Sequence, residues 1–355
     1  MQGRATFQVA AQLCTPRSVA VHKSKGPDIM DDGSVPCPAY AASAIHPLNR
    51  RTFLHGSALF MAGVAADGAG APPVSGTQSV SQTRPAGTTQ PAHGKCVLRI
   101  GLISDPHYAD RSPKINRYYR ESIAKIRESV KQFNKVGIDF AVELGDLIDA
   151  ADSVEDEIAH LKAIVAEYAK LKADRYYVLG NHCVWNLTKQ EFIANTAAKK
   201  AHYSFDKGGF HFVVLDACFR KDGEPYGRQN FDWTDAHILQ SQRDWLEQDL
   251  RQTSLRTIVF VHHRLDVADK YGISNAAEVR KILEDSGKVL AVFQGHYHPG
   301  DYKRINDIHY CTLKALVEGS GKASNAYGIL EVYKDGSLRL DGFRRQCDYA
   351  LSVSE

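Results

Sequence analysis

The chain has 355 residues, of which 43% are hydrophobic and 24% are charged, a composition that excludes a protein disordered throughout. Lysine and arginine together number 44, against 41 aspartates and glutamates, so no strong positive field is available to hold a nucleic acid. We therefore expect one large globular domain or two small ones, without a nucleic-acid partner.

The first recognisable pattern is an arginine pair, Arg50 and Arg51, followed by an interrupted apolar run to Ala66. It resembles a twin-arginine export signal, and its apolar part is too short to span a bilayer. The alternative is a chance arginine pair before a buried helix. Small and polar residues dominate from 67 to 94, a composition that cannot bury a core. We expect an unassigned extension (1–49), a signal (50–71), a disordered linker (72–94) and an exported domain (95–355), periplasmic or extracellular, without a transmembrane span.

Residues 95–355 alternate between apolar runs typical of strands and segments with helical spacing. Ser112 and Pro113 form an N-cap and first-turn pair that predicts a helix ending at Gly137, and another helix is expected after Ser153. The predicted strands are 97–104, 138–144, 176–179, 212–215, 257–261 and 289–293, followed by consecutive strands over 301–345. This order predicts buried sheets flanked by helices.

Polar clusters follow five of these strands. They are Asp105–His107, Gly145–Asp149, Gly180–His182, His262–His263 and Gly295–His298. Each alone is a common cap or turn, but together they stand at carboxyl ends of strands, where open sheets bind ligands. Carboxylate, carboxamide and imidazole without thiolate form the ligand set that holds two divalent cations against phosphate oxygens. The sequence therefore predicts a two-metal site that cleaves phosphate ester or phosphoanhydride bonds.

The expected chemistry follows from two cations that share an anionic ligand. The water between them loses its proton near neutral pH, and the metal-bridging hydroxide attacks phosphorus in line. A protonated side chain opposite the attack donates to the departing oxygen, and His182 is our candidate. His263 is expected to orient a ligand or line the pocket, the alternative being a direct ligand.

The ordered motifs DPH, GDLID, GNH, VHH and GHYH resemble the calcineurin-like metallophosphoesterase superfamily over residues 96 to about 345. This resemblance implies a four-layer αββα sandwich of two mixed sheets flanked by helices. It also implies two divalent or mixed-valence ions of manganese, iron or zinc. The implied ligands are Asp105, His107 and His298 for one ion, Asn181, His262 and His296 for the other, and Asp146 between them. Asp149 is expected to brace its loop.

A narrower resemblance links three segments to the manganese-dependent ADP-ribose and CDP-alcohol diphosphatases: 108–110, 117–122 and 316–319. His107 stands where that subgroup usually has Gln, and Arg264 where many superfamily members have Pro. The resemblance implies a small phosphorylated substrate. If the subgroup's substrate preference also holds for this chain, that substrate is linked to a nucleotide. The alternative of another class is a catalytically inactive, metal-dependent binding protein. The sequence does not fix the oligomeric state.

The segment 226–238 is a candidate substrate loop. Its aromatic residues, including Phe231 and Trp233, could stack on a base or sugar, and Arg228 could meet phosphate. The alternative is that Phe231 and Trp233 only pack the loop onto the core.

Overall fold

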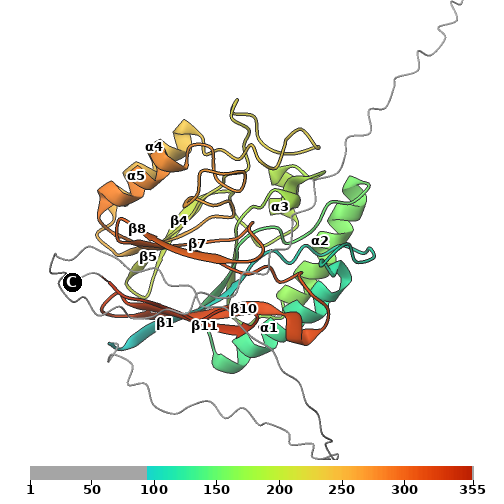
Figure 1. Ribbon diagram of the computed structural model, residues 1–355, viewed down its shortest axis with the longest axis horizontal. Coiled ribbons are helices and arrows are strands. Elements are labelled where there is room, and N and C mark those ends of the chain that lie inside the picture. Colours follow the sequence, from blue (N-terminus) through green and yellow to red (C-terminus); the bar gives the residue numbers. More distant parts are fainter. Residues whose placement is uncertain (1–93, 354–355) are drawn as a thin grey trace, which may run out of the picture.

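The computed structural model describes residues 94–353 (Figure 1). The predicted extension, export signal and nearly all of the linker lie outside the described residues. Within 94–353, no helix combines the length and apolar character that a membrane crossing requires.

Two six-stranded mixed sheets face each other (Figure 1). The strands are β1 Cys96–Ile103, β2 Phe140–Glu143, β3 Asp174–Tyr177, β4 Tyr203–Lys207, β5 Phe210–Val214, β6 Thr257–Phe260, β7 Val289–Gln294, β8 Asp301–Ile305, β9 Ile308–Thr312, β10 Ala326–Tyr333, β11 Leu338–Arg344 and β12 Tyr349–Leu351. The sheet orders are β12-β11-β10-β1-β2-β3 and β4-β5-β6-β7-β9-β8. Strands β1 to β3 are parallel, as are β5, β6, β7 and β9, while the other pairs are antiparallel.

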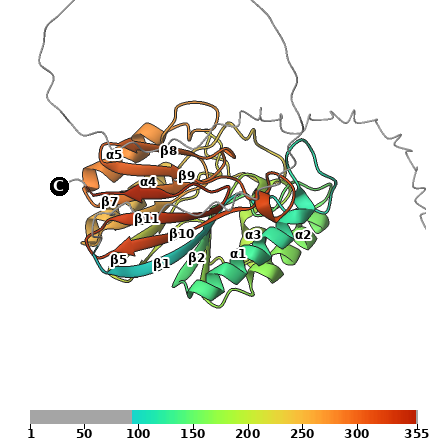
Figure 2. The same ribbon diagram turned by 60° about the horizontal axis from the view of Figure 1, so that its bottom comes forward.

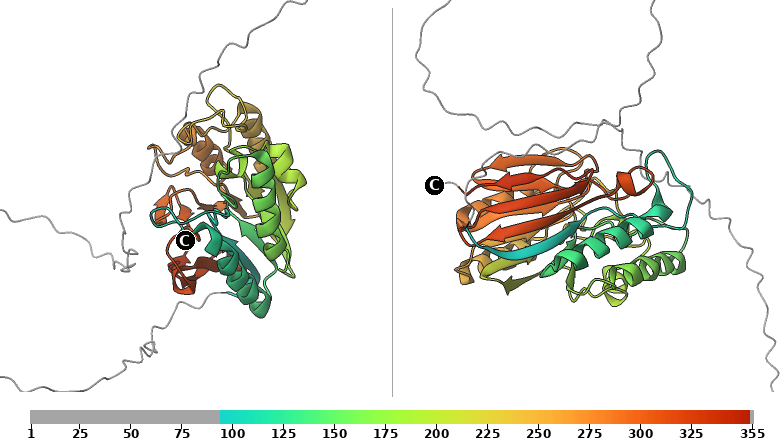
Figure 3. Two further views of the ribbon diagram at one scale, coloured as in Figure 1. Left: turned by 90° about the vertical axis from the view of Figure 1, so that its right-hand side faces the viewer. Right: turned by 90° about the horizontal axis from the view of Figure 1, so that it is seen from below.

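Helices cover the outer face of each sheet (Figures 2 and 3). They are α1 Ser122–Val136, α2 Val154–Tyr168, α3 Lys189–Ala194, α4 Gln240–Gln252 and α5 Ala276–Ser286. Helices α1 and α2 pack over the first sheet, and α4 and α5 over the second. This four-layer sandwich confirms the fold class expected from the sequence.

The space between the sheets is filled by apolar side chains, among them Phe140, Phe212, Phe260 and Phe293, which are fully buried. Because both faces of the central strands are buried, their sequences read as continuous apolar runs, and this made them easy to predict. Interiors packed this closely hold the strand ends in fixed positions.

One predicted helix boundary is wrong. The helix expected from Ser112 begins only at Ser122. Lys114 and Arg117 instead close a tight turn, exchanging backbone hydrogen bonds of 3.1 and 3.0 Å. Arg117 also pairs with Glu318 through the backbone, and this tertiary pairing outweighs the local helical spacing. Strands β4 and β12 were not predicted.

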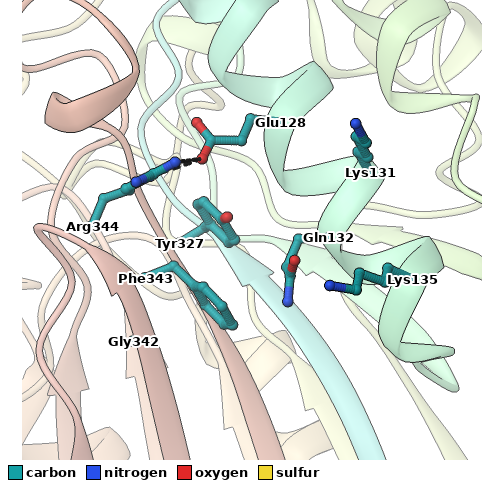
Figure 4. Close-up of a pocket in the computed structure, with 8 residues that line it drawn as sticks. All are labelled: Glu128, Lys131, Gln132, Lys135, Tyr327, Gly342, Phe343 and Arg344. Atoms are coloured by element: carbon teal, nitrogen blue, oxygen red, sulfur yellow. Dashed lines mark hydrogen bonds and ion pairs between the residues drawn. The ribbon is translucent and has the colours of Figure 1, made fainter. Parts of the chain in front are cut away.

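A surface groove runs beside helix α1 and strands β10 and β11 (Figure 4). It is lined by Glu128, Lys131, Gln132, Lys135, Tyr327, Gly342, Phe343 and Arg344. An ion pair of 2.7 Å joins Arg344 to Glu128, and the rings of Tyr327 and Phe343 stack at 4.9 Å. None of the predicted site residues lines this groove.

Candidate metal centre

The loops that follow β1, β2, β3, β6 and β7 bring the predicted site residues together. Backbone hydrogen bonds join these loops directly: the amide of His107 donates to Asp146 at 2.7 Å, and that of Gly295 donates to His262 at 3.0 Å. The assembled side chains, all buried, are Asp105, His107, Asp146, Asn181, His182, His262, His263, His296 and His298. The sequence clusters are therefore one structural unit.

The backbone of this unit is strained. Four of its residues have positive φ: Asp105 (51°), His107 (43°), Asp146 (56°) and His296 (69°). Such angles are uncommon outside glycine and concentrate at functional sites. Two glycines permit close approach, because a Cβ on Gly180 would lie 2.2 Å from Asp146 Oδ1 and one on Gly295 would lie 2.3 Å from Ser104 Oγ. The site geometry thus depends on these glycines.

A first donor group consists of Asp105, His107 and His298. The Nε2 atoms of His107 and His298 are 3.1 Å apart, and Asp105 Oδ1 lies 3.7 and 3.6 Å from them. Asp146 Oδ2 lies 3.5 Å from His107 Nε2. Donors about 2.1 Å from one ion lie roughly 3.0–3.4 Å from each other in tetrahedral or octahedral geometry. The Nε2 pair falls inside this range and the carboxylate oxygens lie slightly beyond it, so a small inward shift would let the group hold a single cation.

A second donor group consists of Asp146, His262 and His296. Asp146 Oδ2 is 3.1 Å from His262 Nε2, while His262 Nδ1 contacts the Leu144 carbonyl at 2.9 Å, which fixes the tautomer with Nε2 free to bind. The Nε2 atoms of His262 and His296 and the Oδ1 atom of Asn181 are buried, without a hydrogen-bond partner in the part of the chain described here. Buried polar atoms need partners, and a second cation would satisfy all three.

The electrostatics also favour cations. Burial acts to raise the pKa of Asp146, but the imidazoles of His262, His182 and His107 outweigh it and hold that pKa well below the ordinary carboxyl value. Asp105 behaves in the same way, with its pKa lowered despite burial. The carboxylates are therefore ionised, and despite burial they raise the pKa of His262 to about 9, so a bound cation would compete with a proton for its Nε2.

His182 is held by Asp149. Its Nδ1 lies 2.7 Å from Asp149 Oδ1, and the other carboxylate oxygen accepts a hydrogen bond of 2.7 Å from Arg111. Burial acts to lower the pKa of His182, but Asp149 and Asp146 outweigh it and raise that pKa. His107, Asp149 and His182 form a third group with ligand spacing. Arg111 and Arg117, which lie 2.7 and 3.8 Å from Asp149 Oδ2, already supply positive charge to this group.

His263 lies beside the second donor group, with its ring centroid 4.5 Å from that of His296 and 5.0 Å from that of His262. Both of its ring nitrogens are buried without a hydrogen-bond partner among residues 94–353. This position fits either a pocket-lining residue or a ligand, and its role stays a prediction.

The candidate substrate loop divides into two parts. Arg228 donates to Glu191 at 2.6 Å and to the Asn186 carbonyl at 2.5 Å, so its guanidinium is already engaged, and its substrate role stays a prediction. Phe231 stacks on Tyr226 at 3.8 Å between ring centroids, as the packing alternative expects.

Trp233 lies next to the donor groups. Its ring centroid is 5.5 Å from that of His296 and 5.6 Å from that of Tyr271, and both aromatic side chains are partly exposed. Lys270 Nζ lies 5.3 Å from the Tyr271 ring centroid. We call the two aromatic residues, Trp233 and Tyr271, together with the adjacent Lys270, the aromatic wall.

Arg264, the departure from proline after the histidine pair, is buried in an ion-pair network. It donates to Asp266 at 3.0 and 2.5 Å and to Asp301 at 2.5 Å, and its guanidinium lies 5.2 Å from the Tyr297 ring. These contacts tie Arg264 to Asp301, which follows the loop that carries His296 and His298. The two carboxylates neutralise the charge of Arg264.

Sequence reasoning assigned no role to Glu318 or Lys125. Glu318 Oε1 accepts a 2.6 Å hydrogen bond from His298 Nδ1, and Lys125 is a fully buried lysine of helix α1. The available signal for Lys125 was its spacing: Ser122, Lys125 and Ser129 recur on one face at helical intervals, and all are buried.

A family model described as calcineurin-like phosphoesterase matches residues 98–300, more than half of the chain. This match confirms the superfamily resemblance read from the motifs.

Curated relatives point the same way. A manganese-dependent ADP-ribose/CDP-alcohol diphosphatase of Oryza sativa subsp. japonica is 27% identical over 300 residues, covering 71% of this chain and 93% of the relative. A protein of the same name from Arabidopsis thaliana is 27% identical and covers 70% and 95%. Among solved structures, a dimetal phosphatase from Danio rerio superposes with a TM-score of 0.65 at 23% identity, covering 73% of this chain and all of that one. That likeness supports the fold.

Replacing the shared carboxylate should remove metal binding. We expect Asp146→Asn to lose at least one bound manganese ion per chain, because a neutral amide cannot offset two nearby cations. Metal content after dialysis against Mn²⁺ measures this. Asp152→Asn, an exposed acid of the same loop, is the control and should bind as wild type. Equal metal content in both variants would rule out a ligand role for Asp146.

Proposed function

Because this chain belongs to the calcineurin-like phosphoesterase family, we propose that it cleaves the phosphoanhydride bond of nucleotide-linked diphosphates, with manganese as the working metal. It is a metal-dependent hydrolase of phosphate ester or anhydride bonds. The observation that carries the proposal is the paired donor groups around Asp146, beside a partly exposed aromatic wall. The names of the rice and Arabidopsis relatives support both substrate class and metal.

The donor groups would divide between two ions. Asp105, His107 and His298 would hold one, Asn181, His262 and His296 the other, and Asp146 would serve both. Two bound divalent cations would supply an activated water and positive charge against the phosphoryl oxygens. The mixed oxygen and nitrogen set, without thiolate, is compatible with manganese.

His182 would act on the leaving group. Asp149 occupies Nδ1, so Nε2 is the nitrogen available to donate a proton to the departing oxygen. The pKa of His182 is raised by its carboxylate neighbours, which favours the protonated form that this role requires. Asp149 would set the ring orientation, a role in addition to the loop bracing expected from the sequence.

The remaining substrate would extend from the ions in two directions. Arg117 lies beside His107 and His182, and its side chain is 19% exposed, so it can reach a second phosphate. On the other side, Trp233 and Tyr271 offer faces on which a planar ring can stack. A diphosphate carrying a base fits this layout better than a simple monoester does.

A substrate panel with Mn²⁺ tests the proposal. ADP-ribose and CDP-choline should be cleaved with kcat/KM at least about tenfold above p-nitrophenyl phosphate and cyclic AMP, because only they can use both the phosphate and ring contacts. Phosphate release after coupling to a phosphomonoesterase measures cleavage of the nucleotides, and nitrophenol release without the coupling enzyme measures cleavage of p-nitrophenyl phosphate. His182→Asn is the control for background activity. Preferential cleavage of cyclic AMP would contradict the diphosphatase assignment.

Two arginines compete for the second phosphate, and KM distinguishes them. Arg117→Ala should raise KM for ADP-ribose by about tenfold, the value of one charge-assisted hydrogen bond, with little change in kcat. Arg228→Ala should change KM less, since Glu191 already neutralises that guanidinium. A larger rise in KM for Arg228→Ala than for Arg117→Ala would instead assign the phosphate contact to Arg228 of the substrate loop, as the sequence suggested.

Export through the twin-arginine route is also proposed, on the sequence pattern at Arg50 and Arg51 alone. In a bacterial host with that translocase, the full chain should appear as a shortened form outside the cytoplasm. Changing both arginines to lysine should leave only the longer cytoplasmic form, as seen by immunoblotting of cell fractions. Export that is unaffected by the change would contradict a twin-arginine signal.

A further inference from the structure

The imidazole of His298 is held at both nitrogens. Its Nε2 faces Asp105 and His107 in the first donor group, and its Nδ1 lies 2.6 Å from Glu318 Oε1. Because a carboxylate can only accept, Nδ1 carries the proton and Nε2 is left with the lone pair that binds metal. Glu318 therefore sets the tautomer and the direction of the ring.

Glu318 stands on a loop that we call the strap, residues 315–319, which forms neither helix nor strand. The strap runs along the metal centre and bonds to it through the backbone. The amide of Val317 donates to the Asp105 carbonyl at 3.2 Å, and that of Ala315 donates to the His298 carbonyl at 3.0 Å. Moving the strap would thus move two residues of the first donor group.

Lys125 of helix α1 fastens the strap. Its ammonium donates three hydrogen bonds, to the carbonyls of Leu316 (2.8 Å), Glu318 (3.0 Å) and Gly319 (2.7 Å). The side chain is buried, and all three acceptors are backbone carbonyls rather than carboxylates. A single side chain therefore fixes the conformation of the segment that orients His298.

This lysine is costly to keep. It lies in the first turn of α1, where the helix dipole disfavours positive charge, and Arg345 is a close neighbour. Burial first, and then Arg345, lower the pKa of Lys125 to about 8. If this position only had to be filled, an apolar side chain would avoid the free-energy cost of burying a charge. The three hydrogen bonds to the strap offset the cost of burying this charge.

We propose that Glu318 and Lys125 are positioning residues for the metal centre: Glu318 orients His298, and Lys125 locks the strap that carries Glu318. Neither residue touches substrate. Outer carboxylates that accept from a ligating histidine typically change metal affinity by about 10–100-fold when replaced. The same effect is expected here, on the ion held by Asp105, His107 and His298.

The strap also holds the turn that carries Arg117, so the two residues should differ in effect. The amide of Gly319 donates to the Asn116 carbonyl at 2.8 Å, and that of Tyr118 donates to Val317 at 3.1 Å. Loss of the Lys125 lock would loosen both the metal ligand and this turn. Loss of the Glu318 charge would leave these backbone bonds in place and act on His298 and on the nearby charge of Arg117.

The test uses metal-free protein titrated with Mn²⁺ in a calorimeter, with steady-state kinetics as a second measurement. Glu318→Gln should weaken one of the two manganese affinities by about tenfold or more. At saturating Mn²⁺ its kcat should recover, and its KM should change less than that of Lys125→Met, because the backbone bonds that hold the Arg117 turn remain. Lys125→Met should weaken the same affinity and also raise KM, and the raised KM should persist at saturating Mn²⁺. A purely structural role would lower the melting temperature without rescue by Mn²⁺.

Matched controls are available elsewhere on α1: Glu128, which pairs with Arg344, and the exposed Lys131. Glu128→Gln and Lys131→Met change the same residue types beside the surface groove, and both should bind Mn²⁺ as wild type (Figure 4). If Lys125→Met fails to fold, Lys125→Gln, which keeps two donors to the strap, should show a smaller loss of affinity than Glu318→Gln. Wild-type manganese affinity in Glu318→Gln, or in a folded Lys125 variant, would overturn the proposal. Because metal binding is measured without substrate, this result is independent of the diphosphatase assignment.

Discussion

The buried carboxylate of Asp146 is the constraint on which the site depends. One oxygen accepts the amide of His182 at 2.8 Å, and the other lies 3.1 Å from His262 and 3.5 Å from His107. It therefore belongs to both donor groups at once. A buried negative charge surrounded by imidazole nitrogens favours positive charge close by, and two divalent cations would supply it with Asp146 as a shared ligand. The chemistry of phosphate cleavage follows from this arrangement.

The fold explains how a chain can assemble such a centre. Two sheets packed face to face hold the carboxyl ends of five strands at one edge, and the loops that leave them are joined by backbone hydrogen bonds. The tight geometry is kept by positive φ at Asp105, His107, Asp146 and His296. Strain of about 1–3 kcal/mol at each such residue persists only where the surrounding packing fixes it. The apolar interior therefore supports the strain on which the site geometry depends.

The sequence predicted much of this because the informative residues are grouped. Continuous apolar runs marked the central strands, and the polar clusters after them contained the nine residues that the structure brings together. The missed features depend on distant contacts. Ile115 sits in a helical pattern, yet its φ of 54° and 58% exposure place it in a turn held by the strap. Lys125 shares a helix face with Ser122 and Ser129, but that spacing does not reveal the strap that folds over it. No local pattern records either contact.

Substrate contacts were the hardest to predict, for a related reason. Arg228 and Trp233 lie five residues apart in one loop, but one pairs with Glu191 and the other faces His296. Which side chains of an irregular loop turn toward the metals is decided by packing against other segments, such as the one that carries Tyr271. Periodicity gives no guidance where there is no repeating structure.

Electron paramagnetic resonance of the metal-free protein titrated with Mn²⁺ tests the central claim most directly. A carboxylate shared between ions about 3.5–4 Å apart should give two manganese ions per chain with an exchange-coupled spectrum. A single bound ion, or two ions with the separate spectra of isolated Mn²⁺, would contradict the account.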